Sequence, residues 1–389
     1  MSGARDTRDT RDTRDTRDTR DTRDTRGAYD VHAHAMPLPV LRFLADRGLA
    51  DLSALPSGVV RLDHRVSGLG QSDVPIPCPP EQYDITARLA RMDREGVARQ
   101  AVSLPPFLTC STTRHEVFVR EIVTAGNDAL AAFCAAAPDR LTPLGTVPIG
   151  SRAAAAEAGR CLGELEMPGL ACGTRGMGRE CDHPVNDPLW ELLGRTRVFT
   201  LLHPSTAPAL DRLTDYWLPQ LVGYPMETAL AVSRLLLGGT LERHEPVLCL
   251  AHGGGCLPAL RGRLDLGWHT KPVARRTARP PRHGLDGLYY DTAVFSTSQL
   301  TSLVADVGPG HVLLGTDSPF DLADTAPLRT VGALGLPADH AALILHRNAT
   351  RLLHRRPDAP PGTATGGATR RSVPTPAAAP RPTHQEAVR

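Results

Sequence analysis

The chain has 389 residues, of which 41% are hydrophobic, so it is long enough to bury the core of one large domain or two smaller ones. The formal net charge is only +2, which argues against nucleic acid or a membrane surface as a partner. No apolar run is long enough to span a bilayer and the first 26 residues hold no signal-peptide core, so we expect a soluble, cytoplasmic protein.

Both ends of the chain have compositions typical of disordered segments. Residues 5–25 are seven consecutive Arg-Asp-Thr triplets, and the C-terminal segment is rich in proline, alanine, threonine and glycine. Neither segment has enough apolar side chains to form a core. We therefore predict a disordered repeat at 1–26, a folded domain at 27–355 and a disordered tail at 356–389.

Short apolar or β-branched segments alternate with amphipathic segments along the folded part, which predicts strands separated by helices. The predicted strands are 28–34, 100–104, 141–147, 169–173, 198–203, 247–252, 288–294 and 312–317. The clearest predicted helices are 85–95, 116–137, 152–166, 227–237 and 300–307. Eight strands, each followed by a helix, predict an α/β fold of the (β/α)8 TIM barrel type. The stretch 37–80 is then a long insertion after the first strand, beside the mouth of the barrel.

Residues that can bind a metal ion or carry a proton lie at several predicted strand ends, where a parallel barrel places its catalytic groups. An H-x-H pair alone is weak evidence, because about 0.6 such pairs are expected by chance with this many histidines. Alternate residues of a strand share a face, so both histidines of the pair can point into the mouth. Imidazole nitrogens and a carboxylate oxygen suit a zinc-like divalent ion with an open position for water. The residues are His32 and His34 at the first strand, His203 at the fifth, His252 at the sixth and Asp317 at the eighth.

Each of these residues also has an ordinary structural explanation. His203 could be a core histidine, with Pro204 ending its strand. His252 begins the sequence HGGG, whose glycines could merely permit a tight turn or could let the backbone approach a substrate closely. Asp317, which precedes Ser-Pro, could be a helix N-cap. Their shared position at strand ends favours a metal site over these separate explanations.

The same residues resemble the decarboxylase branch of the amidohydrolase superfamily. The shared features are H-x-H after the first strand, histidine after the fifth, HGGG after the sixth and GTD-x-PF after the eighth. Residues 216–268 are also similar to the 2-amino-3-carboxymuconate-6-semialdehyde decarboxylase family, as are the shorter segments 87–97 and 289–295. The resemblance covers most of 28–350.

The resemblance implies a role for each residue of the predicted metal site. His252 would be the acid/base residue that activates water at the metal. Binuclear amidohydrolases commonly bridge their metals with a carboxylated lysine on the fourth strand, whereas Lys271, the only lysine of this chain, follows the sixth strand. We therefore expect a single metal ion, with zinc as the usual one. The ligands that the resemblance implies for this Zn²⁺ are His32, His34, His203 and Asp317.

The resemblance also implies how substrate is bound. Arg263 matches an arginine that reaches the active site of a neighbouring subunit and binds the substrate carboxylate. This match implies a homodimer and a small-molecule carboxylate as substrate. Trp217 and Phe320 match aromatic residues that line the pocket, with packing in the core as the alternative for both.

Two features of the chain leave the identity of the substrate open. The family often has a tryptophan directly after the His-Pro of the fifth strand, where this chain has Ser205. A second substrate-binding arginine lies in the insertion after the first strand, and either Arg61 or Arg65 could take its place.

Together these features predict an enzyme, a metal-dependent and non-oxidative decarboxylase, that is a carboxy-lyase, of a small unsaturated or aromatic carboxylic acid. The alternative is a metal-dependent hydrolase or hydratase that acts on a small amide, lactone or unsaturated acid, because the same ligands can activate water for attack on carbon. A barrel that binds a ligand without catalysis is the third hypothesis.

Overall fold

The computed structural model describes residues 27–68 and 74–354, and the predicted tails 1–26 and 356–389 lie outside these residues. Eight parallel strands form one sheet in the order β1-β5-β6-β7-β10-β11-β12-β13. Their bounds are β1 (Ala28–His34), β5 (Val97–Ser103), β6 (Leu141–Val147), β7 (Gly169–Gly173), β10 (Phe199–His203), β11 (Leu248–Leu250), β12 (Tyr289–Asp291) and β13 (Val312–Leu313).

The chain after β13 returns to the first strand and nearly closes the sheet. The amide of Val31 donates to the carbonyl of Leu314, and the amide of Asp317 donates to the carbonyl of His32, both at 2.8 Å. Side chains from β1, β6, β10 and β13 meet in one buried apolar cluster, which places that cluster inside the barrel. The predicted (β/α)8 barrel is therefore confirmed.

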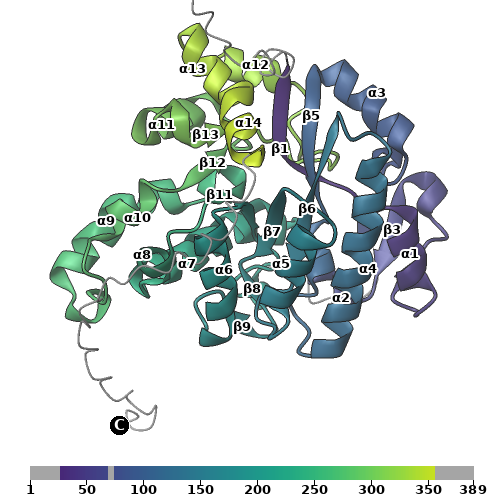
Figure 1. Ribbon diagram of the computed structural model, residues 1–389, viewed down its shortest axis with the longest axis horizontal. Helices are drawn as coiled ribbons and strands as arrows, with labels where there is room; N and C mark the ends of the chain where they lie inside the picture. Colours follow the sequence, from purple (N-terminus) through teal and green to yellow (C-terminus); the bar gives the residue numbers. More distant parts are fainter. Residues whose placement is uncertain (1–26, 69–73, 355–389) are drawn as a thin grey trace, which may run out of the picture. The chain divides into compact units, whose positions relative to one another are not determined.

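Helices alternate with the strands and pack on the outside of the barrel, as α4 and α5 do on β6 (Figure 1). None of the helices in the described part of the chain is long and apolar enough to cross a bilayer. Their bounds are α1 (Leu38–Ala45), α2 (His64–Ser67), α3 (Ile85–Glu95), α4 (Glu116–Ala135), α5 (Ala154–Gly163), α6 (Asp187–Thr196), α7 (Tyr224–Leu237), α8 (Thr240–His244), α9 (Leu257–Thr270), α10 (Pro281–Leu285), α11 (Thr297–Val307), α12 (Pro327–Gly332), α13 (Ala338–Ala342) and α14 (Asn348–Leu353).

Helix α3 has the bounds that its sequence predicts, because both of its ends are capped. The side chain of Asp84 accepts hydrogen bonds from the amides of Thr86 and Ala87 at 2.8 and 3.1 Å. Gly96 ends the helix with a φ of 72°, a left-handed conformation that favours glycine.

The last three barrel strands are shorter than predicted at their C-terminal ends. The sequence predicts strands over 247–252, 288–294 and 312–317, but regular pairing stops at Leu250, Asp291 and Leu313. The backbone then turns out of the sheet, because His252 and Asp317 have φ values of 56° and 63°, which no strand accommodates. The residues that leave the sheet are those that build the candidate site.

The predicted insertion at 37–80 contains regular secondary structure in its described residues, 37–68 and 74–80. It holds α1, α2 and a three-stranded antiparallel sheet of β2 (Ala50–Asp51), β3 (Val59–Leu62) and β4 (Val74–Pro77). Its apolar side chains share a buried cluster with β5 and α4. A Cβ added at Gly68 would lie 2.9 Å from the carbonyl oxygen of Ser205, just after β10, so the insertion reaches the mouth of the barrel. The only other strands in the described residues are β8 (Arg175–Gly176) and β9 (Arg179–Glu180), which form a hairpin after β7.

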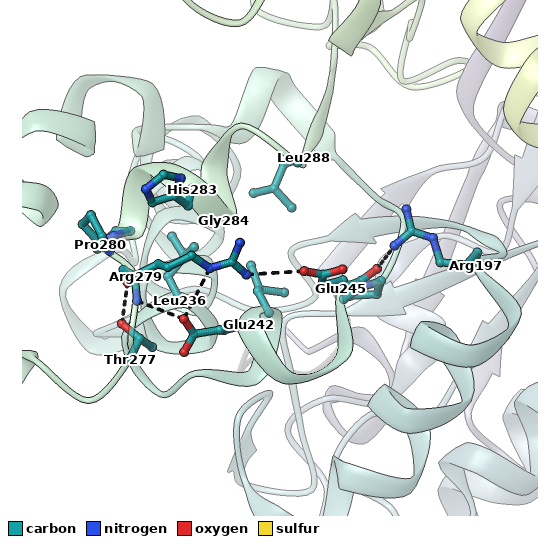
Figure 2. Close-up of a pocket in the computed structure, with 14 residues that line it drawn as sticks. Arg197, Leu236, Glu242, Glu245, Thr277, Arg279, Pro280, His283, Gly284 and Leu288 are labelled. Atoms are coloured by element: carbon teal, nitrogen blue, oxygen red, sulfur yellow. Dashed lines mark hydrogen bonds and ion pairs between the residues drawn. The ribbon is translucent and has the colours of Figure 1, made fainter. Parts of the chain in front are cut away.

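A cavity of about 260 Å³ lies at the N-terminal ends of three barrel strands, away from the mouth of the barrel. Figure 2 shows residues that line it. Arg197, Pro246 and Leu288 line it, and they precede β10, β11 and β12. Its charged groups face one another: Arg279 lies 3.6 Å from a carboxylate oxygen of Glu242 and 3.4 Å from one of Glu245. This cavity is separate from the strand ends where the predicted site residues lie.

Candidate metal centre

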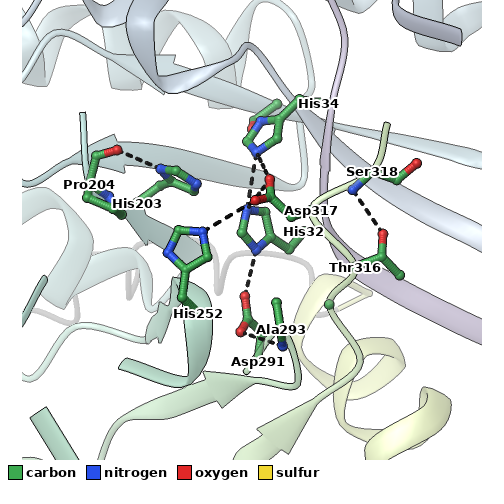
Figure 3. A network of polar contacts seen from close by, with 12 residues as sticks. His32, His34, His203, Pro204, His252, Asp291, Ala293, Thr316, Asp317 and Ser318 are labelled. Atoms are coloured by element: carbon green, nitrogen blue, oxygen red, sulfur yellow. Dashed lines mark hydrogen bonds and ion pairs between the residues drawn. The ribbon is translucent and has the colours of Figure 1, made fainter. Parts of the chain in front are cut away.

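The residues predicted at strand ends meet at the mouth of the barrel (Figure 3). His32 and His34 end β1, His203 ends β10, His252 follows β11 and Asp317 follows β13. The ligand atoms of His32, His34, His203 and Asp317 all lie within 4.8 Å of one another, so these four side chains could hold a metal ion. His34 Nε2 lies 3.1 Å from both His32 Nε2 and Asp317 Oδ1.

The Nδ1 atom of each of these three imidazoles is already engaged, which leaves Nε2 for an ion. His32 Nδ1 lies 2.6 Å from Asp291 Oδ2, and His203 Nδ1 lies 2.7 Å from the carbonyl oxygen of Pro204. His34 Nδ1 faces the carbonyl oxygen of Leu104 at 3.3 Å. Such contacts are typical of metal-binding histidines, because a proton held on Nδ1 leaves the lone pair on Nε2. His203 Nε2 is buried and has no hydrogen-bond partner among the described residues, which fits an atom that binds a cation.

Burial and mutual contact set the charges of the cluster. Burial lowers the pKa of His34 and of His203, so both imidazoles are neutral, as ligands must be. Burial opposes ionisation of Asp317, but the charge of His32 and a hydrogen bond with His252 outweigh it and hold the pKa of Asp317 well below its usual range. Burial disfavours a charge on His32 as well, but Asp317 and Asp291 raise its pKa to about 10. The cluster therefore favours positive charge among its ligand atoms, which is what a divalent cation supplies.

The HGGG sequence forms a tight turn that places His252 beside the cluster. His252 Nε2 lies 3.4 Å from Asp317 Oδ2. The three glycines all have positive φ. A Cβ at Gly253 would lie 2.3 Å from Val294 Cγ1, and one at Gly255 would lie 2.3 Å from the carbonyl oxygen of Pro225. The glycines are thus required by the turn and by its contacts within the protein.

The ordinary explanations of the other two residues do not hold in the structure. Asp317 is not a helix N-cap, because no helix begins between it and Ala326. His203 is not a core histidine with satisfied nitrogens, because its Nε2 has no partner in the described part of the chain. Both side chains instead face the other candidate ligands.

The two aromatic residues predicted to line the pocket have different surroundings. The ring of Phe320 lies 5.5 Å from that of His34 and 6.2 Å from that of Phe107, so it forms a wall of the site. Trp217 lies in the loop before α7 and is 52% exposed. The structure therefore brings Phe320 to the histidines, and it leaves Trp217 at the surface.

The predicted substrate-binding arginines also lie at the surface. Arg263 is exposed on α9 and has no acidic partner within the described residues. Arg65 pairs with Asp63 at 2.8 Å. Arg61 lies on β3, opposite Asp51 on β2, and is exposed. None of these three is among the residues that meet at the strand ends.

Three residues of the site were missed from the sequence. Asp291 ends β12 and contacts His32, as described above. Phe107 follows β5 and packs on Phe320, and the ring of Tyr224, at the start of α7, lies 6.1 Å from that of His203. A signal existed only for Asp291, which is an acidic residue inside a predicted strand of the barrel.

A model of the amidohydrolase family matches residues 29–355, which is most of the chain. The chain belongs to the amidohydrolase family. Its relatives include a 2-amino-3-carboxymuconate-6-semialdehyde decarboxylase from Dictyostelium discoideum, which is 29% identical over 310 residues. That alignment covers 77% of this chain and 83% of the relative. The predicted membership of the decarboxylase branch is thereby confirmed.

Solved structures of other proteins share the fold of this amidohydrolase. A 5-carboxyvanillate decarboxylase from Sphingomonas paucimobilis matches with a TM-score of 0.70 at 24% identity, covering 84% of this chain and 98% of that one. A dihydroxybenzoic acid decarboxylase from Polaromonas, with bound manganese and the inhibitor 2-nitroresorcinol, matches with a TM-score of 0.68 at 21% identity, covering 84% and 96%. Both likenesses concern the fold.

Proposed function

We propose that this amidohydrolase is a metal-dependent, non-oxidative decarboxylase of a small unsaturated or aromatic carboxylic acid. The observation that carries the proposal is the position of His252, whose Nε2 lies 3.4 Å from Asp317 Oδ2 beside four potential metal ligands. The names of the relatives support the same reaction, because they are decarboxylases of unsaturated or aromatic acids.

The proposed metal ligands are His32, His34, His203 and Asp317, which together bind a single ion. Three imidazole nitrogens and one carboxylate oxygen suit Zn²⁺, and our hypothesis is therefore zinc, with Mn²⁺ as the alternative. A divalent ion at this position would supply a Lewis acid that stabilises negative charge as it develops on the substrate.

The proposed role of His252 is to carry the proton that the reaction needs. Decarboxylation adds a proton to the carbon that bears the carboxylate, and the C–C bond pair returns to the substrate as CO₂ leaves. His252 can deliver this proton, since an imidazolium is a common general acid in enzymes. Its Nδ1 is buried and has no hydrogen-bond partner in the described residues. Phe320 and Phe107 keep one wall of the pocket apolar, which suits an unsaturated or aromatic substrate.

We also propose that the protein is a homodimer in which Arg263 of one subunit binds the substrate carboxylate in the other. Arg263 is exposed on α9, which packs against α7. Large apolar side chains are exposed over the loop before α7 and over both helices, as expected of a surface covered by a second copy. These side chains are Tyr216, Trp217, Leu221, Val222, Met226, Leu230 and Leu266.

Release of CO₂ from a panel of acids tests the proposed reaction. The protein is stripped of metal, reconstituted with Zn²⁺ or Mn²⁺, and given freshly generated 2-amino-3-carboxymuconate semialdehyde, 5-carboxyvanillate and dihydroxybenzoates. We expect CO₂ from at least one acid, and none from a His252→Ala variant that binds the same amount of metal. His340→Ala, which changes an exposed histidine on α13, serves as the control and should keep full activity.

Two results would contradict the proposal. Full activity in the His252→Ala variant would remove the role assigned to His252. A metal-loaded parent that releases no CO₂ from any of these acids, but that opens esters or lactones, would favour the hydrolase alternative.

A further inference from the structure

One buried carboxylate contacts two parts of the candidate site at once. Asp291 ends β12 and is fully buried. Its Oδ2 lies 2.6 Å from His32 Nδ1, and its Oδ1 accepts hydrogen bonds from the amides of Gly253 at 2.8 Å and Ala293 at 3.1 Å (Figure 3). Gly253 directly follows His252, so the two oxygens of Asp291 join a candidate metal ligand to the turn that carries the proposed acid/base residue.

The contact between Asp291 and His32 determines which ring nitrogen of His32 has a lone pair available for a metal ion. A carboxylate can only accept a hydrogen bond, so the proton of the neutral imidazole lies on Nδ1, between the two side chains. The lone pair is then on Nε2, which faces Asp317 Oδ1 at 3.3 Å and His34 Nε2 at 3.1 Å. This tautomer is the one that binding a metal through Nε2 requires.

The contact with Gly253 holds a turn that would otherwise be unfavourable. His252 has φ and ψ of 56° and 40°, a left-handed backbone conformation that residues other than glycine rarely adopt. The turn is held by the Asp291 contact on Gly253 and by a hydrogen bond of 2.9 Å from the amide of Gly255 to the carbonyl of His252. Because the direction of the His252 side chain follows from this backbone, Asp291 also helps to aim its Nε2 at Asp317.

We propose that Asp291 is a positioning residue that sets metal affinity through His32 and the placement of His252 through Gly253, using one oxygen for each task. This inference rests on the metal centre and the role of His252 proposed above. It goes beyond those two proposals because it assigns a role to Asp291, which is neither a proposed metal ligand nor a proposed substrate contact. Through this one side chain, metal binding and proton transfer would depend on each other.

Two substitutions at this position separate the two tasks. In Asp291→Asn, the amide oxygen can still accept from Gly253, but the NH₂ group then faces His32 Nδ1 and favours the tautomer with its proton on Nε2. We expect the affinity for Zn²⁺ to fall by about 10- to 100-fold, measured by chelator competition on the metal-free protein. At saturating metal, this variant should regain most of the parent kcat. Asp291→Ala loses both contacts, so it should show the same loss of affinity and keep a lower kcat than the Asn variant at saturating metal.

A matched control and a direct readout keep the test independent of activity. Glu157→Gln changes another buried carboxylate, which accepts from Asn127 and Arg160 away from the site, and it should leave Zn²⁺ affinity unchanged. Ring ¹⁵N shifts of His32 in the Zn²⁺-loaded protein should report a proton on Nδ1 and the metal on Nε2 in the parent, and they should change in Asp291→Asn. The Asn variant alone answers the question about the metal if the Ala variant does not fold.

The possible results separate this inference from the proposed function. A parent that binds no divalent metal overturns both. A parent that binds Zn²⁺, together with an Asp291→Asn variant of equal affinity and unchanged His32 ring shifts, overturns only the role of Asp291 at the metal. Equal kcat of the Asn and Ala variants at saturating metal overturns its role in placing His252.

Discussion

Arg88 on α3 donates a hydrogen bond of 2.8 Å to the side-chain oxygen of Gln100 on β5. Gln100 in turn donates to Asp30 on β1 at 3.0 Å, and the same guanidinium donates to the carbonyl oxygens of His34 and Glu81. Arg88 and Asp30 are both buried, so this network fixes α3 and β5 to the strand that ends in the first two candidate ligands. A buried charge of this kind is tolerated only when its hydrogen bonds are satisfied.

The network predicts that Arg88→Met is strongly destabilising. The substitution leaves buried acceptors without a donor and removes a buried cation that interacts with Asp30, so the free energy of unfolding should fall by about 3–5 kcal/mol. Urea unfolding of the metal-free protein measures this change. Arg94→Met is the control on the same helix, because Arg94 is 67% exposed, and its effect should stay under about 0.5 kcal/mol. Equal effects of the two substitutions would contradict the prediction.

Glu227 on α7 predicts a pH dependence of stability. It is buried, and its Oε1 has no hydrogen-bond partner among the described residues. Burial raises the pKa of Glu227 from an ordinary value of 4.5 to about 7. Between pH 4.5 and about pH 7, Glu227 is protonated in the folded protein but has lost its proton in the unfolded chain. The free energy of unfolding therefore falls as pH rises through this window, and the contribution of Glu227 is constant above it.

A Glu227→Gln variant should remove this dependence, because its amide does not ionise. We expect the variant and the parent to differ little in free energy of unfolding at pH 5. At pH 8 the variant should be more stable, by on the order of 2 to 3 kcal/mol. Glu121→Gln, at an exposed position of α4, should give a difference that does not change with pH. A pH-independent effect of Glu227→Gln would show that the carboxyl is not protonated in the folded protein.

The residues of the metal centre could be predicted from the sequence because of a property of the fold. The C-terminal ends of parallel strands share one edge, so His203 and Asp317 meet the H-x-H pair although they are far apart in the chain. Asp291 could not be assigned in this way, since its role depends on which side chains its two oxygens reach. Arg263 and Trp217 are exposed in the single chain, and their roles at the site stay predictions. Two predicted strands extend past their observed ends, as far as His252 and Asp317. The sequence gives no sign of the positive φ values that His252 and Asp317 adopt.

The unpartnered Nε2 of His203 predicts that metal binding stabilises the protein through this residue. Saturating Zn²⁺ should raise the free energy of unfolding of the parent, by about 4 kcal/mol at a free concentration a thousandfold above Kd. His203→Ala should lose most of this increase, and His340→Ala should keep it. Thermal unfolding with and without added Zn²⁺ measures the difference. An unchanged metal-dependent shift in His203→Ala would exclude His203 as a ligand.

Mixing two inactive variants tests whether Arg263 serves the site of a second subunit. His252→Ala lacks the proposed acid/base residue, and Arg263→Ala lacks the proposed substrate arginine, so each should be inactive or nearly so as a pure protein. When equal amounts are unfolded together and refolded, about half of the dimers are mixed, and each mixed dimer has one complete site. Activity should therefore recover to about a quarter of that of the parent. His252→Ala mixed with His203→Ala should recover none, because both residues belong to the site of their own subunit. No recovery in the first mixture, although both variants remain dimeric, would place Arg263 outside the partner's site.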